Sequence, residues 1–420
     1  MDTLEKAPGR HKDQGPCRTM LCLFIHRYRW GRQIRGDERG FLEKARVYKA
    51  RRICLLTVEM PPSFQRDMGE NAYDSFEMRK CRLPIRSPLD LATVLFMSIP
   101  RLVLARFEKP SAIYAYNQDP ENVITGYLLK IILHRPLVIV YHHLLEDAFA
   151  SLQVGIASRR QRGYGLASSI WRSIVPAVNR FSAIRADGHL ALSKATRTDV
   201  AKSLGIHDCV VVGNGLDHEK FSESRRSQVF EAVFLGRLTP QKGIDILLKS
   251  WSIVRGKLPQ AKLLLLGGGE KNNIETYRAM TRDLGIDDAV IFKGFVGDKE
   301  LVELLNSSKV FVFPSRNEGF AQAVSQAMGC GLCCVLSNIP PLKDVYDDVA
   351  IFVPPDRPVE LADAVLSVLA DDGERVKLGA RGRAHVQQFS WEKVVDKESD
   401  EISHAILNYG LARKRKLRNP

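Results

Sequence analysis

FLGRLTPQKG at residues 234–243 and SRNEGFAQAVSQAMGCGLCCV at residues 315–335 are the two stretches that decide the fold. In the first, an apolar run ends at Gly236, Arg237 follows in a loop, and Lys242 stands where a helical pattern begins. Arginine offers a planar fork to phosphate oxygens and lysine a compact charge, so the two can neutralise a diphosphate without a metal. For this stretch taken alone, a solvated turn is the competing interpretation.

The second stretch has the same order of strand, loop and helix. Residues 310–313 predict a buried strand, and residues 321–329 predict a helix that is preceded by Glu318, Gly319 and Phe320. Unpaired backbone N–H groups at a helix start bind anions, and the Glu318 carboxylate can accept hydrogen bonds from sugar hydroxyls. The competing interpretation is that Glu318 only caps the helix.

Taken together, GRLTPQKG and NEGFAQAVSQAMGCG resemble the donor-binding half of the family 4 glycosyltransferases, retaining enzymes of the GT-B fold that use nucleotide-activated sugars. Residues 196–221, TRTDVAKSLGIHDCVVVGNGLDHEKF, resemble the family's lead-in to the crossing between domains. Residues 347–391, which end in Phe389-Ser390-Trp391, resemble its closing helices. The resemblance covers residues 191–392 well and residues 51–187 loosely.

The resemblance implies that Arg237 and Lys242 hold the donor diphosphate and that Glu318 binds the transferred sugar. It assigns four neighbours to the same donor site: Gly236, Gly319, Phe320 and Ala321. The family places a second glutamate eight positions after the first, for the ribose hydroxyls, but this chain has Gln326 there. Glutamine loses charge-assisted hydrogen bonds worth on the order of 1–3 kcal/mol, so weaker donor binding or a different nucleotide is expected.

The strand expected after Pro136 resembles the family strand whose end delivers a histidine toward the reacting sugar. His142 is therefore predicted to be catalytic together with Arg237, Lys242 and Glu318. His143 is an adjacent competitor, because alternation along a strand turns only one of the two rings into the cleft. A structural hydrogen-bonding role is the alternative for His142. Glu146 and Asp147 follow in the same loop and either act on the acceptor or serve as charges at a helix start.

The implied chemistry is glycosyl transfer with retention, in which the diphosphate leaves as the acceptor hydroxyl arrives on the same face. Stabilisation of the leaving group's charge would be the main catalytic contribution. Glycoside hydrolysis needs two carboxylates, and Glu318 has no evident partner in the sequence. The chain contains no Asp-x-Asp triplet of the kind that bridges a metal to a diphosphate, so neither a metal nor a cofactor is expected.

The length of 420 residues exceeds the usual size of one domain. Apolar runs alternate with helix-length stretches in both halves, which favours parallel sheets covered on both faces. The expected strands are residues 53–58, 112–116, 137–141 and 189–193 in the first half and residues 232–235, 262–266, 289–292, 310–313 and 333–336 in the second. The predicted fold is therefore α/β of the GT-B type, with two Rossmann-like domains that face each other across a cleft.

The sequence divides into four predicted parts. These are a basic N-terminal extension at residues 1–47, an acceptor-side domain at residues 48–214, a donor-binding domain at residues 215–390 and a C-terminal helix with a basic tail at residues 391–420. The polar residues 217–228 are the expected linker. The first half departs from the family, because the strand at residues 53–58, taken as the first, leads into Glu59 and Met60 rather than into a glycine-rich loop.

Positive charge is concentrated in particular segments. The net charge is +14, and residues 1–52 together with residues 413–418 contribute 13 of it. A third basic stretch, residues 148–186, holds six arginines and no acid, interleaved with aromatic residues. This pattern suits an anionic membrane surface, and a solvated basic face with disordered ends is the open alternative. No nucleic-acid partner is expected, because no recognised binding motif accompanies the charge.

Three smaller features are two further apolar runs and a pair of cysteines. Residues 20–30, MLCLFIHRYRW, are too short to span a bilayer and lack a signal cleavage site, so an interfacial anchor and a disordered extension stay open. Residues 90–105 predict a buried crossover helix. Cys330 and Cys333 form a C-x-x-C spacing that is attributed to packing rather than to zinc, which fits a reducing cytoplasmic setting.

The resemblance thus implies a glycosyltransferase of the EC 2.4 type, cytoplasmic or peripheral on the inner face of the membrane. It would move a sugar from a nucleotide-diphosphate sugar to a lipid-linked or saccharide acceptor in glycan or glycolipid biosynthesis. The alternatives are a GT-B epimerase or phosphorylase that acts on sugar nucleotides, and a catalytically weak homologue that only binds them.

Overall fold

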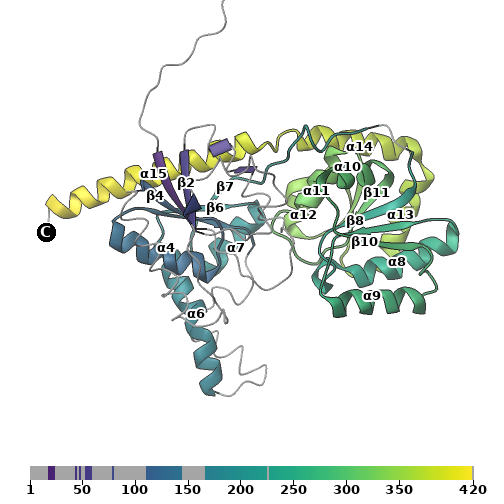
Figure 1. Cartoon of the computed structure of the whole chain (residues 1–420), viewed down its shortest axis with the longest axis horizontal. Helices are drawn as coiled ribbons and strands as arrows, with labels where there is room; N and C mark the ends of the chain where they lie inside the picture. The colour runs from purple at the N-terminus through teal and green to yellow at the C-terminus, as the bar shows by residue number, and fades with distance from the viewer. Residues whose placement is uncertain are drawn as a thin grey trace, which may run out of the picture.

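The computed structural model describes residues 18–23, 43–44, 47–48, 53–58, 78–79, 110–143, 166–224 and 227–418. These residues form two α/β domains that lie side by side, each with its own parallel sheet (Figure 1). The two-domain α/β architecture expected from the sequence is therefore confirmed. None of the described helices combines the length and the apolar character needed to cross a bilayer.

The first domain contains a seven-stranded sheet in the order β3-β2-β1-β4-β5-β6-β7, with every pairing parallel. Its strands are β1 (Arg18–Leu23), β2 (Ile53–Val58), β3 (Met78–Arg79), β4 (Ala112–Ala115), β5 (Leu137–Tyr141), β6 (Gly188–Ala191) and β7 (Val210–Val211). Its helices are α4 (Pro120–Leu133), α6 (Leu166–Ile184), α7 (Lys194–Leu204) and α15 (Trp391–Arg418).

Side chains of this sheet alternate between two apolar layers, as a period of two residues requires. Val138 and Val140 of β5 pack in a cluster with Val395 of α15, whereas Ile139 and Tyr141 pack in a second cluster with residues of α4, α6 and α7. The sheet is consequently covered on both faces, and its strands are continuous apolar runs rather than alternating ones.

The structure corrects the interpretation of the N-terminal apolar run. Residues 18–23 form β1, which pairs with β2 on one side and β4 on the other, so they are neither an interfacial anchor nor a disordered extension. The strand at residues 53–58 is therefore β2 and not the first strand, so the expected departure from the family in the loop after it was assigned to the wrong strand. The residues that follow β1 up to residue 42, and residues 90–105, lie outside the described part of the chain.

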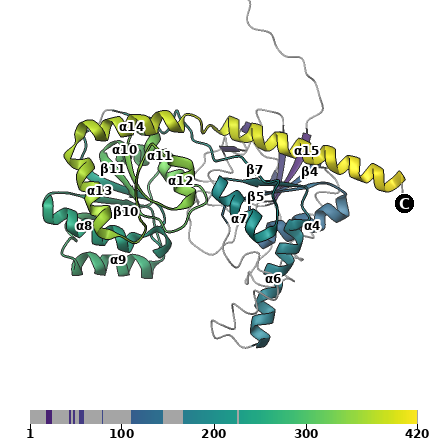
Figure 2. The ribbon, with the colours of Figure 1, turned by 180° about the vertical axis from the view of Figure 1, so that it is seen from behind.

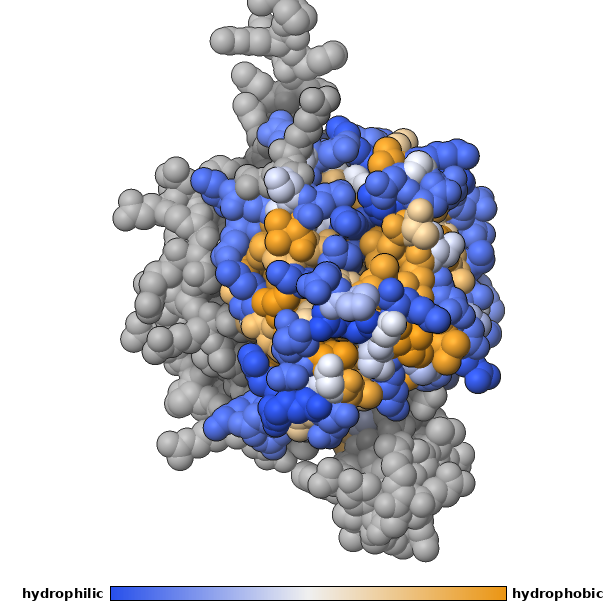
Figure 3. All heavy atoms as spheres, turned by 90° about the vertical axis from the view of Figure 1, so that its right-hand side faces the viewer, coloured by the Kyte–Doolittle hydropathy of each residue, from blue (hydrophilic) through white to orange (hydrophobic). Residues whose placement is uncertain are grey.

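The second domain contains a six-stranded parallel sheet in the order β10-β9-β8-β11-β12-β13. Its strands are β8 (Phe230–Leu235), β9 (Leu263–Leu266), β10 (Val290–Gly294), β11 (Ser308–Phe313), β12 (Cys333–Ser337) and β13 (Ile351–Val353). Its helices are the 3₁₀ turn η2 (Pro240–Lys242), α8 (Ile244–Lys257), α9 (Lys271–Asp283), α10 (Asp298–Asn306), α11 (Gln322–Gly329), α12 (Pro340–Tyr346), α13 (Pro358–Ala370) and α14 (Asp372–Val386). The outer face of this domain mixes hydrophilic and apolar side chains (Figure 3).

The cysteines of the second domain lie in its core. Cys330 and Cys333 are buried free thiols, and burial raises the pKa of each to about 12. Thiols with such a high pKa are poor metal ligands and nucleophiles near neutral pH. Their burial supports the packing role.

The final helix returns to the first domain. α15 lies along the first sheet in both views of the ribbon (Figures 1 and 2), and its Ile402 and Ala405 belong to that domain's core. Its buried Glu398 pairs with Lys44 and accepts a hydrogen bond of 2.9 Å from Tyr48 Oη. Segments near both ends of the described chain thus contribute to the first domain.

The chain crosses between the domains twice, and the two crossings touch. Leu216 pairs with Ser390, and the Leu216 N–H donates to the Phe389 carbonyl at 2.7 Å. Gly215 faces the Trp391 indole so closely that a Cβ added there would lie 2.2 Å from a ring carbon. The Asn214-Gly215-Leu216-Asp217 and Phe389-Ser390-Trp391 segments therefore form one packed unit.

The domains also meet away from these crossings. The Asp344 carboxylate of α12 accepts hydrogen bonds from the backbone N–H groups of Lys194 and Ala195, at 2.6 and 3.2 Å, and so caps the start of α7. A carboxylate at a helix N-terminus interacts favourably with the helix dipole. One domain thus supplies the helix cap of the other.

Replacement of Gly215 by alanine is expected to lower stability by about 1–3 kcal/mol, because the added methyl group overpacks against Trp391. Thermal unfolding of the two proteins checks this. Gly256→Ala in α8 is the matched control, since nothing lies within 4 Å of its Cβ position and alanine favours a helix. Equal melting temperatures for wild type and Gly215→Ala would contradict the packing described for the two crossings.

Candidate functional site

The loop after β8 carries two of the residues predicted to bind the donor. Arg237 follows the strand with an exposed side chain, for which the described residues provide no hydrogen bond or ion pair. Lys242 ends the turn η2, and Gly243 follows with φ of 68°. A Cβ at Gly243 would lie 2.0 Å from the Pro314 carbonyl oxygen, so this loop is pressed against the loop that follows β11.

Arg316 fastens these two loops together. Its guanidinium donates to both carboxylate oxygens of Asp245, at 2.9 and 2.8 Å, and to Asp356 at 2.7 Å. It also donates to the Pro240 carbonyl, and its backbone N–H donates to the Gln241 carbonyl at 2.9 Å. Burial alone would raise the pKa of Asp245, but the hydrogen bonds from Arg316 hold it below its ordinary value. The loop after β8 is therefore tied to the loop after β11 by charge-assisted hydrogen bonds.

Lys242 and Glu318 are brought together by this arrangement. Their side chains form an ion pair, with only 14% and 8% of the respective side chains exposed. The Lys242 ammonium also lies 5.4 Å from the centre of the Phe313 ring. A buried charge is tolerated only when it is paired, so an anion that binds Lys242 must compete with Glu318 or share the cation with it.

His142 reaches the same place from the first domain. A Cβ at Gly319 would lie 1.6 Å from the His142 carbonyl oxygen and 3.1 Å from the His143 Cβ. Both histidines follow the end of β5, so strand alternation does not separate them. The residues after Glu318 therefore contact the end of β5 through backbone that only glycine can provide.

The His142 ring has a fixed orientation. Its Nε2 lies 2.8 Å from the Tyr116 carbonyl oxygen, an arrangement in which Nε2 carries the proton and donates, and the ring stacks edge-on against Tyr116 at 5.0 Å. Gln118 holds the backbone on both sides, since its Oε1 accepts from the His142 N–H at 2.9 Å and its Nε2 donates to the His143 carbonyl at 2.7 Å. Glu146 and Asp147, the other acidic candidates of this loop, lie outside the described residues.

The remaining residues predicted to bind the sugar donor lie just before α11 or within it. The Phe320 ring packs edge-on against Tyr346 and Phe389, at 6.2 and 5.6 Å, and the Ala321 carbonyl accepts from Tyr346 Oη at 2.9 Å. Within the described chain, the backbone N–H groups of residues 319–321 make no hydrogen bond. Gln326 lies in the second turn of α11 with 9% exposure. The site thus offers three successive backbone donors beside Glu318.

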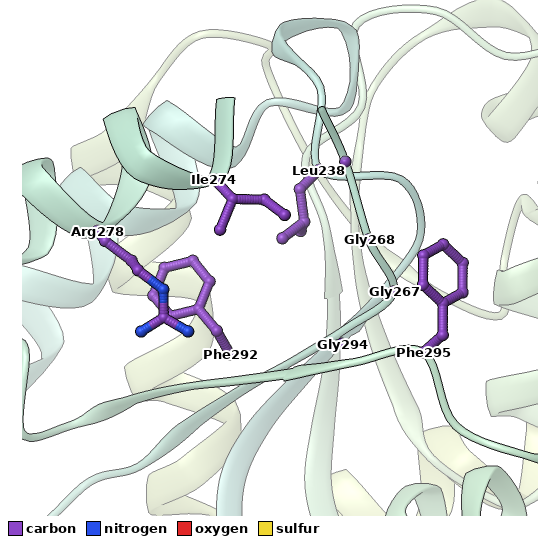
Figure 4. A pocket seen from close by; sticks show the side chains of 9 residues that line it. Leu238, Gly267, Gly268, Ile274, Arg278, Phe292, Gly294 and Phe295 are labelled. Carbon is purple, nitrogen blue, oxygen red and sulfur yellow. The ribbon is translucent and has the colours of Figure 1, made fainter. Parts of the chain in front are cut away.

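A pocket of about 300 Å³ adjoins the loop that carries Arg237, and it was not predicted from the sequence (Figure 4). It lies where β9 and β10 end, with Ile274, Arg278 and Phe292 on one side and Phe295 on the other. Its remaining lining is Leu238 and the glycines 267, 268, 269 and 294. Three consecutive glycines directly after a buried strand were the signal that could have predicted it, because ligands bind at the carboxyl ends of such strands.

The glycines of this pocket allow close backbone packing. A Cβ at Gly267 would lie 2.1 Å from the Gly236 carbonyl oxygen, and one at Gly268 would lie 1.9 Å from the Phe295 ring. The loop after β9 is thus fixed against the loop that carries Arg237. The pocket therefore lies beside the loop that carries Arg237.

Two α/β domains, each built on a parallel sheet, give this chain the GT-B fold. Residues 36–220 match the family model described as Glycosyltransferase Family 4, and residues 216–385 match the model described as Glycosyl transferases group 1. The chain belongs to this family of glycosyltransferases, as its motifs predicted.

Curated relatives resemble parts of the chain. The O-antigen chain mannosyltransferase B of Escherichia coli is 29% identical over 161 residues, which cover 38% of this chain and 42% of that protein. The phosphatidyl-myo-inositol mannosyltransferase of Mycobacterium tuberculosis is 29% identical over 220 residues, which cover 49% and 57%. The match thus spans about half the length of these relatives.

A solved structure resembles the whole fold. The HepE protein of Anabaena, determined in complex with UDP and glucose, superposes with a TM-score of 0.71 and 19% identity. The superposition covers 91% of this chain and 99% of that one. At this identity the likeness establishes the GT-B fold.

Replacement of Arg316 by glutamine should weaken the binding of a nucleoside diphosphate about tenfold, because it removes the paired charge-assisted hydrogen bonds that join the two loops. Isothermal titration checks this. Arg255→Gln is the matched control, since Arg255 makes a similar ion pair with Asp288 in the same domain. Unchanged affinity in Arg316→Gln would show that the ligand loops hold their geometry without this contact.

Proposed function

We propose that this protein transfers a glycosyl group, with retention of configuration, from a nucleotide-diphosphate sugar to a saccharide or lipid-linked acceptor. The observation that carries the proposal is the convergence of the loops of Arg237, Lys242 and Glu318 and a glycine-lined pocket at one edge of the second sheet, against His142 of the first domain. Each group suits one part of such a donor.

The donor would lie along the loops in order. The base would occupy the pocket between Phe292 and Phe295, and the diphosphate would bind the Arg237 guanidinium and the Lys242 ammonium. The sugar would lie at Glu318 and the backbone N–H groups of residues 319–321. Solved structures of similar fold that contain UDP, or UDP-glucose, support this assignment.

The same groups account for the chemistry. As the bond between the sugar and the diphosphate breaks, negative charge grows on the leaving oxygen, and Arg237 and Lys242 would stabilise it where it forms. Lys242 is already held by Glu318 and Phe313, so little reorganisation would accompany the reaction. The acceptor hydroxyl would arrive on the face that the diphosphate leaves and would pass its proton to an oxygen of the departing diphosphate, with His142 and its carbonyl beside the sugar.

Gln326 would contact the nucleotide ribose from the second turn of α11. Its amide can accept one hydrogen bond and donate another, whereas a carboxylate could accept both ribose hydroxyls. The neutral side chain would therefore lower donor affinity relative to a glutamate.

The relatives and the net charge of the chain bear on the acceptor and on the location of the enzyme. Mannosyltransferases of O-antigen chains and of phosphatidyl-myo-inositol are among the relatives, which supports a saccharide or lipid-linked acceptor in glycan or glycolipid biosynthesis. A cytoplasmic enzyme at the inner face of an anionic membrane would agree with the net charge of +14.

Titration with a panel of nucleotides and nucleotide sugars tests the donor site. Glu318→Ala should weaken the best nucleotide sugar about tenfold or more, since it removes charge-assisted hydrogen bonds to the sugar. Gln326→Glu should preserve or strengthen binding. Glu360→Ala, an exposed carboxylate of α13 in the same domain, is the matched control. Absence of binding across the panel would favour a fold retained without transferase activity.

Turnover distinguishes the reaction types. Release of nucleoside diphosphate only when an acceptor is supplied is expected of a transferase, whereas an epimerase would convert the nucleotide sugar without an acceptor. The anomeric configuration of the product, read by proton NMR, should equal that of the donor. An inverted product would exclude the retaining mechanism.

Replacement of Phe295 by alanine tests the base pocket. Loss of the aromatic face should cost roughly 1–3 kcal/mol of nucleotide binding, by analogy with base stacking on aromatic side chains. Inorganic pyrophosphate, which has no base, should bind both proteins alike. Phe181→Ala in the first domain is the control, because that ring has nearly the same exposure as Phe295. A drop of equal size with pyrophosphate would mean that Phe295 supports the loop rather than the base.

A further inference from the structure

Arg278 is the single polar side chain among the nine described residues that line the pocket after β9 (Figure 4). The other eight are glycine, leucine, isoleucine and phenylalanine residues. With a volume of about 300 Å³, the pocket lies at the lower end of the range of small-molecule sites. It therefore suits one ring system of a ligand, and selection among ring systems by side-chain hydrogen bonds would depend on Arg278.

An aromatic ring positions the Arg278 side chain. Arg278 lies in the middle of α9, and its guanidinium carbon lies 4.6 Å from the centre of the Phe292 ring of β10. Cation–π contact limits where the guanidinium lies but leaves its N–H groups for other partners. Within the described part of the chain, no oxygen accepts a hydrogen bond from this guanidinium. Glu275, one turn earlier on α9, lies 3.7 Å from Lys271 and pairs with it instead. The donors of Arg278 are thus open to a ligand.

The donors of an arginine distinguish the bases of nucleotides. A guanidinium offers two parallel N–H groups and no acceptor, so it recognises two neighbouring acceptors. Guanine presents such a pair, N7 and O6, on one edge. On the corresponding edge, adenine and cytosine carry an amino group that donates, and uracil, like thymine, has the single acceptor O4. Of these four bases, guanine alone can therefore take both hydrogen bonds of the fork.

We propose that Arg278 selects the nucleotide and that the sugar donor is a guanosine-diphosphate sugar. Guanine would lie in the pocket, and its N7 and O6 would accept two hydrogen bonds from the Arg278 guanidinium. This inference rests on the proposed function and adds the identity of the base to it. Leu238, the residue directly after Arg237, belongs to the lining of the pocket. The base and the diphosphate would therefore bind adjacent parts of one loop.

A phosphate group is the other ligand that an unpaired arginine can bind. The surroundings of Arg278 disfavour it. Ile274, Phe292 and Phe295 are apolar, and the described lining includes no second cation. A phosphate beside these side chains would lose water without gaining a hydrogen bond in return. A base would instead cover apolar surface, including the Phe295 ring, which is 49% exposed. The lining thus favours a heterocycle with acceptors along one edge.

Isothermal titration of the full chain with the diphosphates of guanosine, uridine, adenosine and cytidine tests the proposal. Guanosine diphosphate should bind about tenfold more tightly than the others, by analogy with the discrimination that a bidentate arginine–guanine pair provides in DNA recognition. Inosine diphosphate, which keeps N7 and O6 and lacks only the 2-amino group, should bind nearly as well. The 7-deaza analogue of guanosine diphosphate should bind severalfold more weakly, because it leaves the fork a single acceptor.

Variants of Arg278 test the same contact from the protein side. Arg278→Ala should lower the affinity for guanosine diphosphate about tenfold, to the level of uridine diphosphate. It should leave the affinities for uridine diphosphate and inorganic pyrophosphate unchanged. Arg278→Lys should lose most of the same preference, since an ammonium group keeps the charge but not the fork. Arg282→Ala is the matched control, because Arg282 is exposed one turn further along α9 and lies outside the pocket lining.

The pattern of affinities keeps this inference apart from the proposed function. Tightest binding of a diphosphate other than that of guanosine, or a guanosine preference that survives in Arg278→Ala, would overturn the role of Arg278 and leave the donor site in place. Equal losses of guanosine diphosphate and pyrophosphate in Arg278→Ala would assign Arg278 to the diphosphate instead. Absence of binding by every nucleotide and by pyrophosphate would overturn both proposals.

Discussion

The loops of the candidate site are held together by close backbone contacts at glycine residues. These contacts leave no room for a Cβ atom. Added Cβ atoms at Gly267, Gly243 and Gly319 would lie 2.1, 2.0 and 1.6 Å from carbonyl oxygens of neighbouring loops. These contacts connect the loop after β9 to the loop after β8, that loop to the one after β11, and the last to the end of β5 in the first domain. A methyl group at any of these positions would push two loops apart, so the geometry of the whole site depends on them.

Charge is distributed on this framework in two ways. Lys242 and Glu318 are largely buried and paired, so their positions are set before any anion arrives. Arg316 joins Asp245 and Asp356 and serves the framework itself. Arg237 is exposed and makes no ion pair within the described residues. The site thus combines a fixed cation with one whose side chain can adjust to a ligand, which suits a group whose charge shifts during reaction.

The sequence predicted the periodic parts of this fold, and the candidate donor-binding residues that stand next to them stay a prediction. Buried strands of parallel sheets are continuous apolar runs, and β2 and β5 begin and end where those runs do. The strand β1 was missed because a short apolar run surrounded by arginines fits a strand and a surface anchor equally well, and only pairing with β2 and β4 decides between them. The pocket was missed because its glycines carry no side-chain chemistry, and the role of Arg316 because an ion pair between distant loops leaves no local pattern.

The two adjacent crossings make the second domain an insertion into the first. The chain leaves the first domain at Leu216 and returns at Ser390, beside the point of departure. A rigid rotation of the inserted domain about this double hinge would separate Gly319 from His142 and Asp344 from the start of α7. The pocket, Arg237, Lys242 and Glu318 all lie on the rotating side, so the domains could part for exchange of ligands while the donor loops kept their arrangement.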